Sequence, residues 1–416
     1  MNWICCQIGA REQYAVPRIF RSHGILQSLI TDVWAPAYMQ PLLSGLKVAR
    51  QFRNRFHPDL AQADVRDFKT TFFSENLLSH VRQCENWTRT YRVNRSFAEN
   101  AGREITDIAR RHEIQGVFAY SYAALEAFET AKRLGLSTIL GQIDAGPFAE
   151  EIYDQAYSQI GLLNERRSRP PKAYWGSWHR ECELADLIVV NSQWSKRSLE
   201  RANIPADKIT VIPVAFDTND FGRREKSYES IVPAKFSFDE PLKIIFIGRV
   251  SIEKGIHHLL QAAHELKKDP VLFQLIGALN LSRQLLASAP GNVQFIGPVP
   301  RGSVKTHLER AHLLLFPSPS DGFGIVQLEA HASGLPVLAS ANCGDVVVDG
   351  QTGLILAELT PAVISDAIRR TIQHPEALVA MSRLAHNRAM DFSLARVGRM
   401  WVQEIRSMQS MDQLTQ

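Results

Sequence analysis

The sequence predicts an α/β protein with two domains, each built on a parallel sheet covered by helices. The chain has 416 residues, and at roughly 150 residues per domain this length favours two or three domains. Short apolar runs alternate with segments of helical periodicity, which is typical of parallel sheets. A charged stretch without periodicity, residues 216–240, separates two such series and contains Pro233, so it is the expected linker.

The first series contains five expected strands, each a short apolar run. They cover residues 3–8, 116–120, 137–140, 187–190 and 210–212. A helix is expected over 124–134, and residues 59–111 are expected to form a mostly helical, polar insertion. The aromatic stretch 170–179 contains Trp175 and Trp178 beside several cations. It is expected either to be a loop that covers the core or to contact an acceptor or a membrane.

The second series contains five more expected strands. They cover residues 243–247, 272–276, 293–296, 313–316 and 337–339, with helices over 256–267, 304–310 and 325–333. Two open parallel sheets joined by a linker face each other across a cleft. Ligands bind beyond the carboxyl ends of such strands, and a cleft between domains suits two substrates.

The composition excludes several classes of protein. Hydrophobic residues make up 45% and charged residues 22% of the chain, which is ordinary globular usage and excludes a wholly disordered chain. Subtracting the 43 acidic residues from the 47 basic ones leaves a net charge of +4, an excess too small to argue for a nucleic-acid partner. Five cysteines without metal-ligand spacing favour a reducing compartment.

We therefore expect a cytoplasmic protein. The apolar stretch 1–10 is too short for a secretion signal, and no apolar run approaches the length of a membrane span. Residues 46–56 alternate apolar side chains with Lys47, Arg50, Arg53 and Arg55. This pattern is typical of an ordinary surface helix and, less commonly, of a segment that lies on anionic lipid at the inner face of a membrane.

The densest chemical signal lies between residues 318 and 329. A strand ends at Phe316, a loop with Gly322 and Gly324 follows, and a helix begins. Such glycines let the backbone approach a ligand, and a helix N-terminus suits a diphosphate. Asp321 precedes the turn and Glu329 lies just inside the helix. Two carboxylates at such positions suit a polyhydroxylated ligand, although a plain helix start with a solvated Glu329 has the same spacing.

The second signal is Gly-Arg-Val-Ser-Ile-Glu-Lys-Gly at residues 248–255, which follows a strand and precedes a helix. Arg249 and Lys254 lie where their cations can bind phosphate oxygens. A solvated basic loop has the same composition. The phosphate interpretation is favoured because this loop and residues 321–329 both follow strands of the same expected sheet.

These residues resemble the retaining glycosyltransferases of family 4, which have the GT-B fold. The motifs are Gly-Arg-x4-Lys-Gly, Pro-Ser-x2-Asp-Gly-Phe-Gly-x4-Glu, Ala-Ser-Gly-Leu-Pro-Val and Gly-Gln-Thr-Gly-Leu, within residues 241–356. Supporting matches lie within residues 183–221. Residues 392–407 resemble the last helix of the family, which crosses back to the first domain. The implied fold is two Rossmann-like, doubly wound domains, 1–220 and 221–390, with residues 391–416 as the returning helix.

The resemblance implies a role for each matched residue. Arg249 and Lys254 would hold the donor diphosphate, together with backbone amides around 324–326, and Glu329 would bind the ribose. Asp321 would contact the donor sugar and, with the two cations, is expected to be catalytic. The complete expected donor set is Gly9, Arg249, Lys254, Gly297, Val299, Asp321, Gly322, Phe323, Gly324, Ile325, Val326 and Glu329.

The sequence departs from the family pattern at several of these positions. Asp321 replaces the usual glutamate, and its carboxylate reaches about 1.5 Å less far. The double glycine of the first loop is replaced by Gly9, Ala10 and Arg11. Asp144 follows the third strand, where the family often has a histidine. Arg11 and Asp144 are the acceptor-side candidates, although a loop-capping aspartate is the favoured interpretation of Asp144.

We therefore expect a retaining, metal-independent enzyme that transfers a sugar from a nucleotide-diphosphate sugar to a glycan, lipid or small molecule, with no other cofactor. No Asp-x-Asp metal motif lies in a suitable place. The alternative is a nucleotide-sugar-binding partner protein without transfer activity. A sugar epimerase or a glycan phosphorylase of similar fold is a weaker third alternative. The base, sugar, acceptor and oligomeric state do not follow from the sequence.

Overall fold

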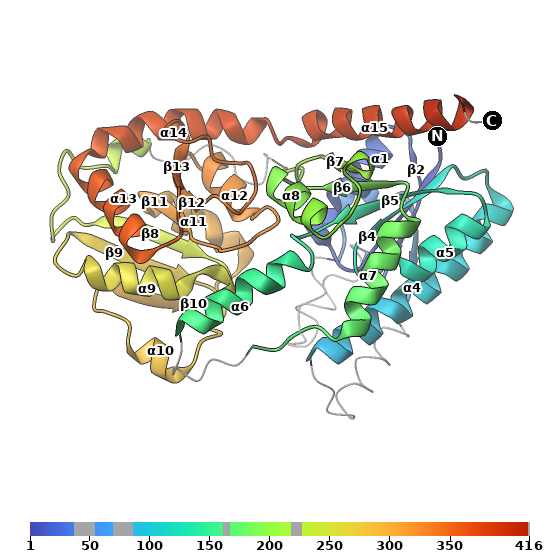
Figure 1. Cartoon of the computed structure of the whole chain (residues 1–416). Coiled ribbons are helices and arrows are strands. Elements are labelled where there is room, and N and C mark those ends of the chain that lie inside the picture. Colours follow the sequence, from blue (N-terminus) through green and yellow to red (C-terminus); the bar gives the residue numbers. More distant parts are fainter. Residues whose placement is uncertain (37–54, 70–85, 161–166, 218–226, 415–416) are drawn as a thin grey trace.

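The structure is a computed structural model that describes residues 1–36, 55–69, 86–160, 167–217 and 227–414. It contains two sheets, each with its own covering helices (Figure 1). All paired strands in both sheets are parallel. The α/β architecture with two parallel sheets is therefore confirmed.

The first sheet has seven strands in the order β3-β2-β1-β4-β5-β6-β7. Its first six strands follow the doubly wound order of a Rossmann-like domain, in which the chain reverses direction across the sheet between the first and fourth strands. The strands are β1 Trp3–Gln7, β2 Leu26–Thr31, β3 Asp64–Asp67, β4 Gly116–Tyr120, β5 Ser137–Gln142, β6 Leu187–Val190 and β7 Ile209–Val211. The helices are α1 Ala15–Ser22, α4 Asn86–Arg111, α5 Leu125–Arg133, α6 Phe148–Ile160, α7 Lys172–Leu184 and α8 Gln193–Arg201.

The second sheet repeats this order with six strands, β10-β9-β8-β11-β12-β13. The strands are β8 Leu242–Ile247, β9 Val271–Ile276, β10 Val293–Gly297, β11 Leu313–Phe316, β12 Val337–Ser340 and β13 Gly353–Leu356. The helices after β8 are α9 Ile256–Glu265, α10 Arg283–Ala287, α11 Val304–Arg310, α12 Val326–Ala332, α13 Pro361–Gln373, α14 Pro375–Met390 and α15 Leu394–Leu414.

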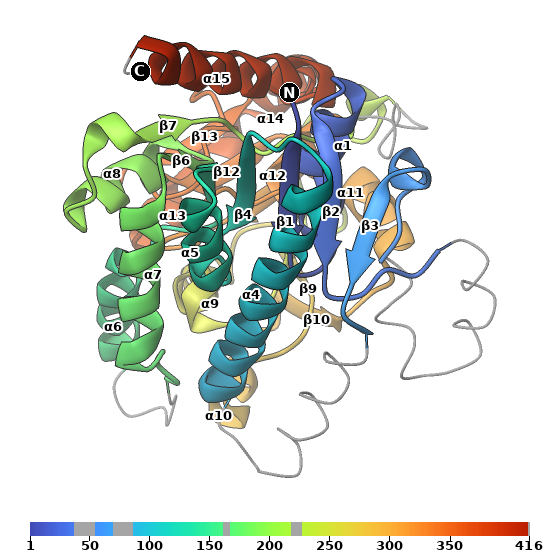
Figure 2. The same ribbon diagram turned by 90° about the vertical axis from the view of Figure 1, so that its right-hand side faces the viewer.

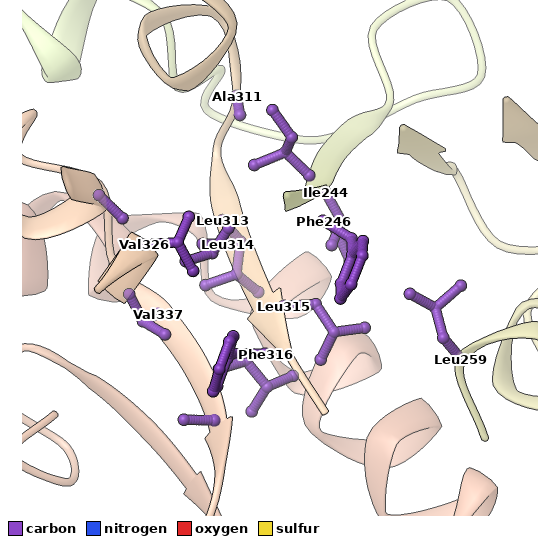
Figure 3. Close-up of a cluster of buried hydrophobic side chains, with 14 of the residues drawn as sticks. Ile244, Phe246, Leu259, Ala311, Leu313, Leu314, Leu315, Phe316, Val326 and Val337 are labelled. Carbon is purple, nitrogen blue, oxygen red and sulfur yellow. The ribbon is translucent and has the colours of Figure 1, made fainter. Parts of the chain in front are cut away.

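The core of the second sheet explains why its central strands appear as uninterrupted apolar runs. All four residues of β11 are buried, because helices cover both faces of the strand. Figure 3 shows side chains of β8 and β11 gathered with Leu259 of α9 and Val326 of α12. A parallel strand buried on both faces loses the alternation that marks a half-exposed strand, so only its length and its flanking turns identify it.

The last helix returns to the first sheet. In α15 Trp401 packs edge-on against Phe20 of α1, with 5.7 Å between ring centroids. The two crossings between the sheets meet where the Phe216 amide donates a hydrogen bond of 2.7 Å to the Phe392 carbonyl. Figures 1 and 2 show α15 lying along the first domain. The exact domain boundaries at 220 and 390 stay predictions.

One expectation about the first half of the chain was incomplete and another was wrong. Most of the described part of residues 59–111 is helical, as expected, but Asp64–Asp67 is the edge strand β3. Its sequence is polar and it pairs only with β2, so no apolar run marks it. The aromatic stretch 170–179 is not a loop: Lys172–Leu184 forms α7, and Trp178 is fully buried against the core.

Candidate active site

A cavity of about 440 Å³ lies between the two domains, at the carboxyl ends of their strands. The first domain contributes the loop after β1 and residues that follow β5 and β6. The second domain contributes the loop after β11. The lining residues are Ile8, Ala10, Arg11, Glu12, Gln13, Ile143, Asn191, Val214, Arg301, Asp321, Phe323, Gly324 and Ile325. Part of the predicted 318–329 signal therefore lines the cleft, whereas Arg249 and Lys254 of the 248–255 signal are not among its lining residues.

The two loops of the second domain meet through an ion pair between the Lys254 ammonium and the Asp321 carboxylate. The contact depends on Gly255, whose φ is +72°. A Cβ atom at this position would lie 1.8 Å from the Pro317 carbonyl oxygen, so only glycine lets the loops approach this closely. The sequence placed both residues at this sheet edge but did not predict that they pair.

Glu329 lies on α12, and its side chain is 8% exposed. It accepts a hydrogen bond of 3.3 Å from the Arg301 guanidinium. Arg301 follows β10 and lines the cleft, but it was not among the residues expected from the sequence. A cation shortly after a strand end is a pattern that could have indicated Arg301. The expected donor set contained the neighbouring Gly297 and Val299 in its place. Neither of those two lines the cavity.

The other predicted donor residues are placed as follows. Phe323, Gly324 and Ile325 line the cavity, whereas Gly322 and Val326 do not. Arg249 is exposed, and its guanidinium forms no ion pair with the residues that the structure describes. The backbone amide of Gly9 donates to Asp32 at 2.9 Å. Asp32 also pairs with Arg55 at 2.8 Å.

The first-domain wall is a strained turn. Glu12, Gln13 and Tyr14 all have left-handed φ values, +50°, +53° and +60°, which cost energy in residues other than glycine. The turn brings Glu12 to the cavity, where Tyr120 donates to its carboxylate at 3.1 Å. Burial raises the pKa of Glu12. The sequence offered no signal for Glu12, since nothing local marks three consecutive left-handed residues.

Asp144 stands beside this wall and does not line the cavity. One of its carboxylate oxygens, Oδ1, accepts hydrogen bonds from the Tyr122 hydroxyl at 2.5 Å and the Gly146 amide at 2.9 Å. Burial raises the pKa of Asp144, against the effect of these hydrogen bonds. The bond to Gly146 is the one that a loop-capping aspartate makes. Arg11, the other acceptor-side candidate, lines the cavity and lies 5.3 Å from the centre of the Tyr120 ring.

The loop around Asp321 is also held from the opposite domain. The Ser192 hydroxyl donates to the Gly322 carbonyl at 2.7 Å, and the Trp194 indole donates to the Ser320 hydroxyl at 3.2 Å. A Cβ atom on Gly322 would lie 2.5 Å from the Ile143 carbonyl oxygen. Gly322 is therefore required by the closeness of the two domains, and not only by a ligand.

The described residues contain neither a candidate metal site nor a candidate membrane span. They contain no group of three or more His, Cys, Asp or Glu residues that could hold a metal ion. None of the helices that the structure describes is long and apolar enough to cross a membrane. Most of the basic segment 46–56 lies outside the described residues, but Arg55 is within them and its guanidinium is paired with Asp32.

Comparison with known proteins agrees with this geometry. Residues 228–388 match the family model of glycosyl transferases group 1. D-inositol 3-phosphate glycosyltransferase of Corynebacterium aurimucosum is 28% identical over 51% of this chain and 54% of its own length. Alpha-maltose-1-phosphate synthase of Mycolicibacterium smegmatis is 28% identical over 47% of this chain and 56% of its own length. The chain thus aligns with little more than half the length of these curated relatives.

Solved structures resemble nearly the whole chain. HepE of Anabaena, in complex with UDP and glucose, superposes with a TM-score of 0.62 at 17% identity and covers 98% of this chain and 100% of its own. At that identity the likeness establishes the fold. The chain therefore has the GT-B fold of these structures, and residues 228–388 resemble the glycosyl transferases group 1.

Proposed function

We propose that the protein transfers a sugar from a nucleotide-diphosphate sugar to an acceptor bound in the cleft, with retention of the anomeric configuration and without a metal ion. The observation that carries this proposal is the Lys254–Asp321 pair at the cleft, within the segment that matches the group 1 family. HepE, which has the same fold, forms a complex with UDP and glucose, and this supports a nucleotide-sugar donor.

Donor binding is proposed to exchange the partner of Lys254. The diphosphate competes with Asp321 for the Lys254 ammonium, and Asp321 is then available to accept hydrogen bonds from sugar hydroxyls. Arg249 is exposed near the same loop and adds a second cation for the departing diphosphate. Fixed cations that meet the charge developing on the leaving group lower the barrier, because no solvent must reorganise.

Glu329 is proposed to bind the ribose. Its carboxylate is nearly buried and is paired with Arg301, so ribose hydroxyls must share it with the guanidinium or displace it. Asp321 and Glu329 position the donor, and neither is proposed as a nucleophile. In this scheme the donor phosphate itself takes the acceptor proton.

The test is release of nucleotide diphosphate from a panel of UDP, GDP and ADP sugars, with the anomeric configuration of the product read by NMR. Lys254→Ala and Arg249→Ala are expected to weaken donor binding at least about tenfold, since a hydrogen bond to a charged group contributes about 1.5–3 kcal/mol. Lys268→Ala, in an exposed position after α9, is the matched control. Equal kinetics in all three variants would contradict the assignment.

Chelation tests the metal-independent part of the proposal separately. We expect turnover to persist in EDTA, because the proposed neutralising charges are side-chain cations. Loss of turnover in EDTA, with recovery on addition of Mg²⁺ or Mn²⁺, would show that a metal neutralises the diphosphate instead.

The second candidate is a nucleotide-sugar-binding partner protein that does not transfer. Asp321 favours it, because it is shorter than the usual glutamate and is already paired with Lys254. This candidate predicts that a nucleotide sugar binds and raises the unfolding temperature, while no nucleotide diphosphate is released with any acceptor.

A further inference from the structure

Helix α6 belongs to the first domain by chain order, but it packs against the second. Ala156 is buried in the hydrophobic cluster of the second sheet, and Tyr157 and Ile160 pack against that cluster. Figure 1 shows α6 extending from the first domain across to the second. A helix in this position can transmit the placement of one domain to the loops of the other.

Two tyrosines on α6 contact the two loops that carry the ion pair. Tyr153 donates a hydrogen bond of 3.1 Å to the Ser320 carbonyl, and Tyr157 donates one of 2.7 Å to the Glu253 carboxylate. Residues four apart share one face of a helix. Ser320 immediately precedes Asp321 and Glu253 immediately precedes Lys254, so one helical face holds both sides of the pair.

The bond from Tyr157 determines where the Glu253 carboxylate points. Its second oxygen, Oε2, is buried and has no hydrogen-bond partner among the described residues. The Glu253 residue is partly exposed. Without the Tyr157 hydroxyl, Oε1 would lose its hydrogen bond and the carboxylate would be free to turn. The adjacent cation is Lys254. Held by Tyr157, the Glu253 carboxylate forms no ion pair with Lys254, whose ammonium pairs with Asp321.

Tyr153 is placed to remain a donor. Burial, together with nearby carboxylates of which Asp321 has the largest effect, raises the pKa of Tyr153 well above its usual value. Its hydroxyl therefore stays protonated throughout the pH range of the protein. The bond to Ser320 fixes the backbone from which the Asp321 side chain extends.

The helix is itself anchored to the first domain. The Arg167 guanidinium pairs with Glu150 at 2.6 Å and also with Asp154, and its side chain is 7% exposed. Arg167 lies in the segment that leads into α7. A nearly buried, doubly paired arginine holds the N-terminal half of α6 in place, so α6 does not act as an independent flap.

We propose that Tyr153 and Tyr157 are positioning residues, the α6 clamp, which hold Asp321 and Lys254 in the arrangement that donor binding and transfer require. The clamp makes the donor loops of the second domain dependent on the docking of the first. This inference rests on the proposed function for its effect on catalysis, but its effect on the loops can be measured without a donor.

The first experiment is hydrogen–deuterium exchange on the full chain without any nucleotide. In the double variant Tyr153→Phe/Tyr157→Phe, backbone amides of residues 251–255 and 318–324 are expected to exchange about tenfold faster. Loss of the hydrogen bonds lowers the free energy of local opening, and about 1.4 kcal/mol corresponds to a tenfold change. Tyr91→Phe is the matched control. The Tyr91 hydroxyl forms a hydrogen bond of 3.2 Å with the Ser177 hydroxyl, and this bond lies outside the cleft. Unchanged exchange in both segments would overturn the clamp, whatever the protein catalyses.

The second experiment measures binding of UDP, GDP and ADP by calorimetry. Tyr157→Phe is expected to lower the affinity for the nucleotide about tenfold, because Glu253 then competes for Lys254. In a Glu253→Gln background the same substitution is expected to change affinity by less than about twofold, since a neutral amide does not compete. A merely structural role predicts equal losses in both backgrounds, and that result would contradict the mechanism.

The third experiment separates turnover from binding. Tyr153→Phe is expected to lower kcat about tenfold and to leave nucleotide-diphosphate affinity within about threefold, because it displaces Asp321 and not Lys254. Unchanged kcat in a folded Tyr153→Phe variant would remove Tyr153 from the clamp. A wild-type protein that binds none of the three nucleotides contradicts the proposed function instead, and the exchange experiment still decides the clamp.

Discussion

At the residue scale, Asp321 and Glu329 differ in their burial and in the cation with which each is paired. Asp321 lines the cleft and pairs with Lys254, whereas Glu329 lies deeper on α12 and is bound by Arg301. The spacing of the two acids could be predicted from the sequence. Their partners could not, because Lys254 and Arg301 arrive from loops that are distant along the chain.

This difference predicts separate effects of removing each acid. Asp321→Ala should depress turnover while leaving nucleotide-diphosphate binding intact or stronger, because Lys254 loses its competing partner. Glu329→Ala should weaken nucleotide-diphosphate binding, because ribose contacts are lost. Calorimetry with a nucleotide diphosphate that lacks the sugar distinguishes them. Loss of binding in Asp321→Ala alone would reverse our orientation of the donor.

Glu12 provides a second prediction at this scale. Glu12 lines the cavity from the first domain, the side on which the proposed function places the acceptor, so we expect it to accept a hydrogen bond from an acceptor hydroxyl. Glu12→Gln should raise the acceptor KM and lower kcat severalfold, with donor affinity unchanged.

The pH profile gives Glu12 a distinctive signature. Because burial raises its pKa above that of an ordinary glutamate, wild-type activity should decline on acidification earlier than activity in Glu12→Gln. Glu113→Gln, at an exposed position outside the cleft, should match wild type. Identical acid limbs in all three proteins would exclude Glu12 from the acceptor site.

At the element scale, what could be predicted depended on burial. The strands β4, β6 and β11 match the predicted ranges because continuous apolar runs bounded by turns leave little choice. The strands β2, β3 and β13 were missed. The strand β3 is a polar edge strand, β13 is a short edge strand, and the apolar residues of β2 are interrupted by Gln27 and Ser28 although its last four residues are buried. Helix α6 offered no local sign that its tyrosines reach the other domain, since that depends entirely on tertiary placement.

The loop between β11 and α12 gives a prediction at this scale. Gly322→Ala should lower turnover at least about tenfold while the second domain stays folded, because the new Cβ would meet the Ile143 carbonyl of the first domain. Gly291→Ala is the control, since nothing lies within 4 Å of a Cβ atom there. Near-normal turnover in Gly322→Ala would mean that the domains need not approach this closely for transfer.

At the scale of the whole molecule, buried histidines make stability depend on pH. Burial lowers the pKa of His257 to about 3 and the pKa of His258 and His331 to about 4. All three belong to helices of the second domain. The unfolded chain binds protons at these residues near pH 6.5 and the folded chain does not. Their contribution to stability is therefore present above that pH and is lost as the pH falls toward 4.

We expect the unfolding temperature to fall between pH 7.5 and pH 5. Each histidine lowers the free energy of unfolding by at most about 1.4 kcal/mol per pH unit in this range. His331→Gln keeps a donor for the Thr352 carbonyl, which His331 contacts at 3.0 Å, and should flatten the dependence. His374→Gln, at a side chain 66% exposed, should not. An equally steep loss in His331→Gln would exclude His331 as a source.

The bond between Phe216 and Phe392 has a mechanical consequence. The two chain segments that cross between the domains are hydrogen-bonded to each other at this point, so a rotation of one domain relative to the other would be centred on this pivot. Figure 1 shows the junction between α14 and α15 at the top of the view and α6 in its lower half. Leverage is greatest there, and a small angular movement at the pivot separates α6 from the second domain further than it separates any contact near the crossings.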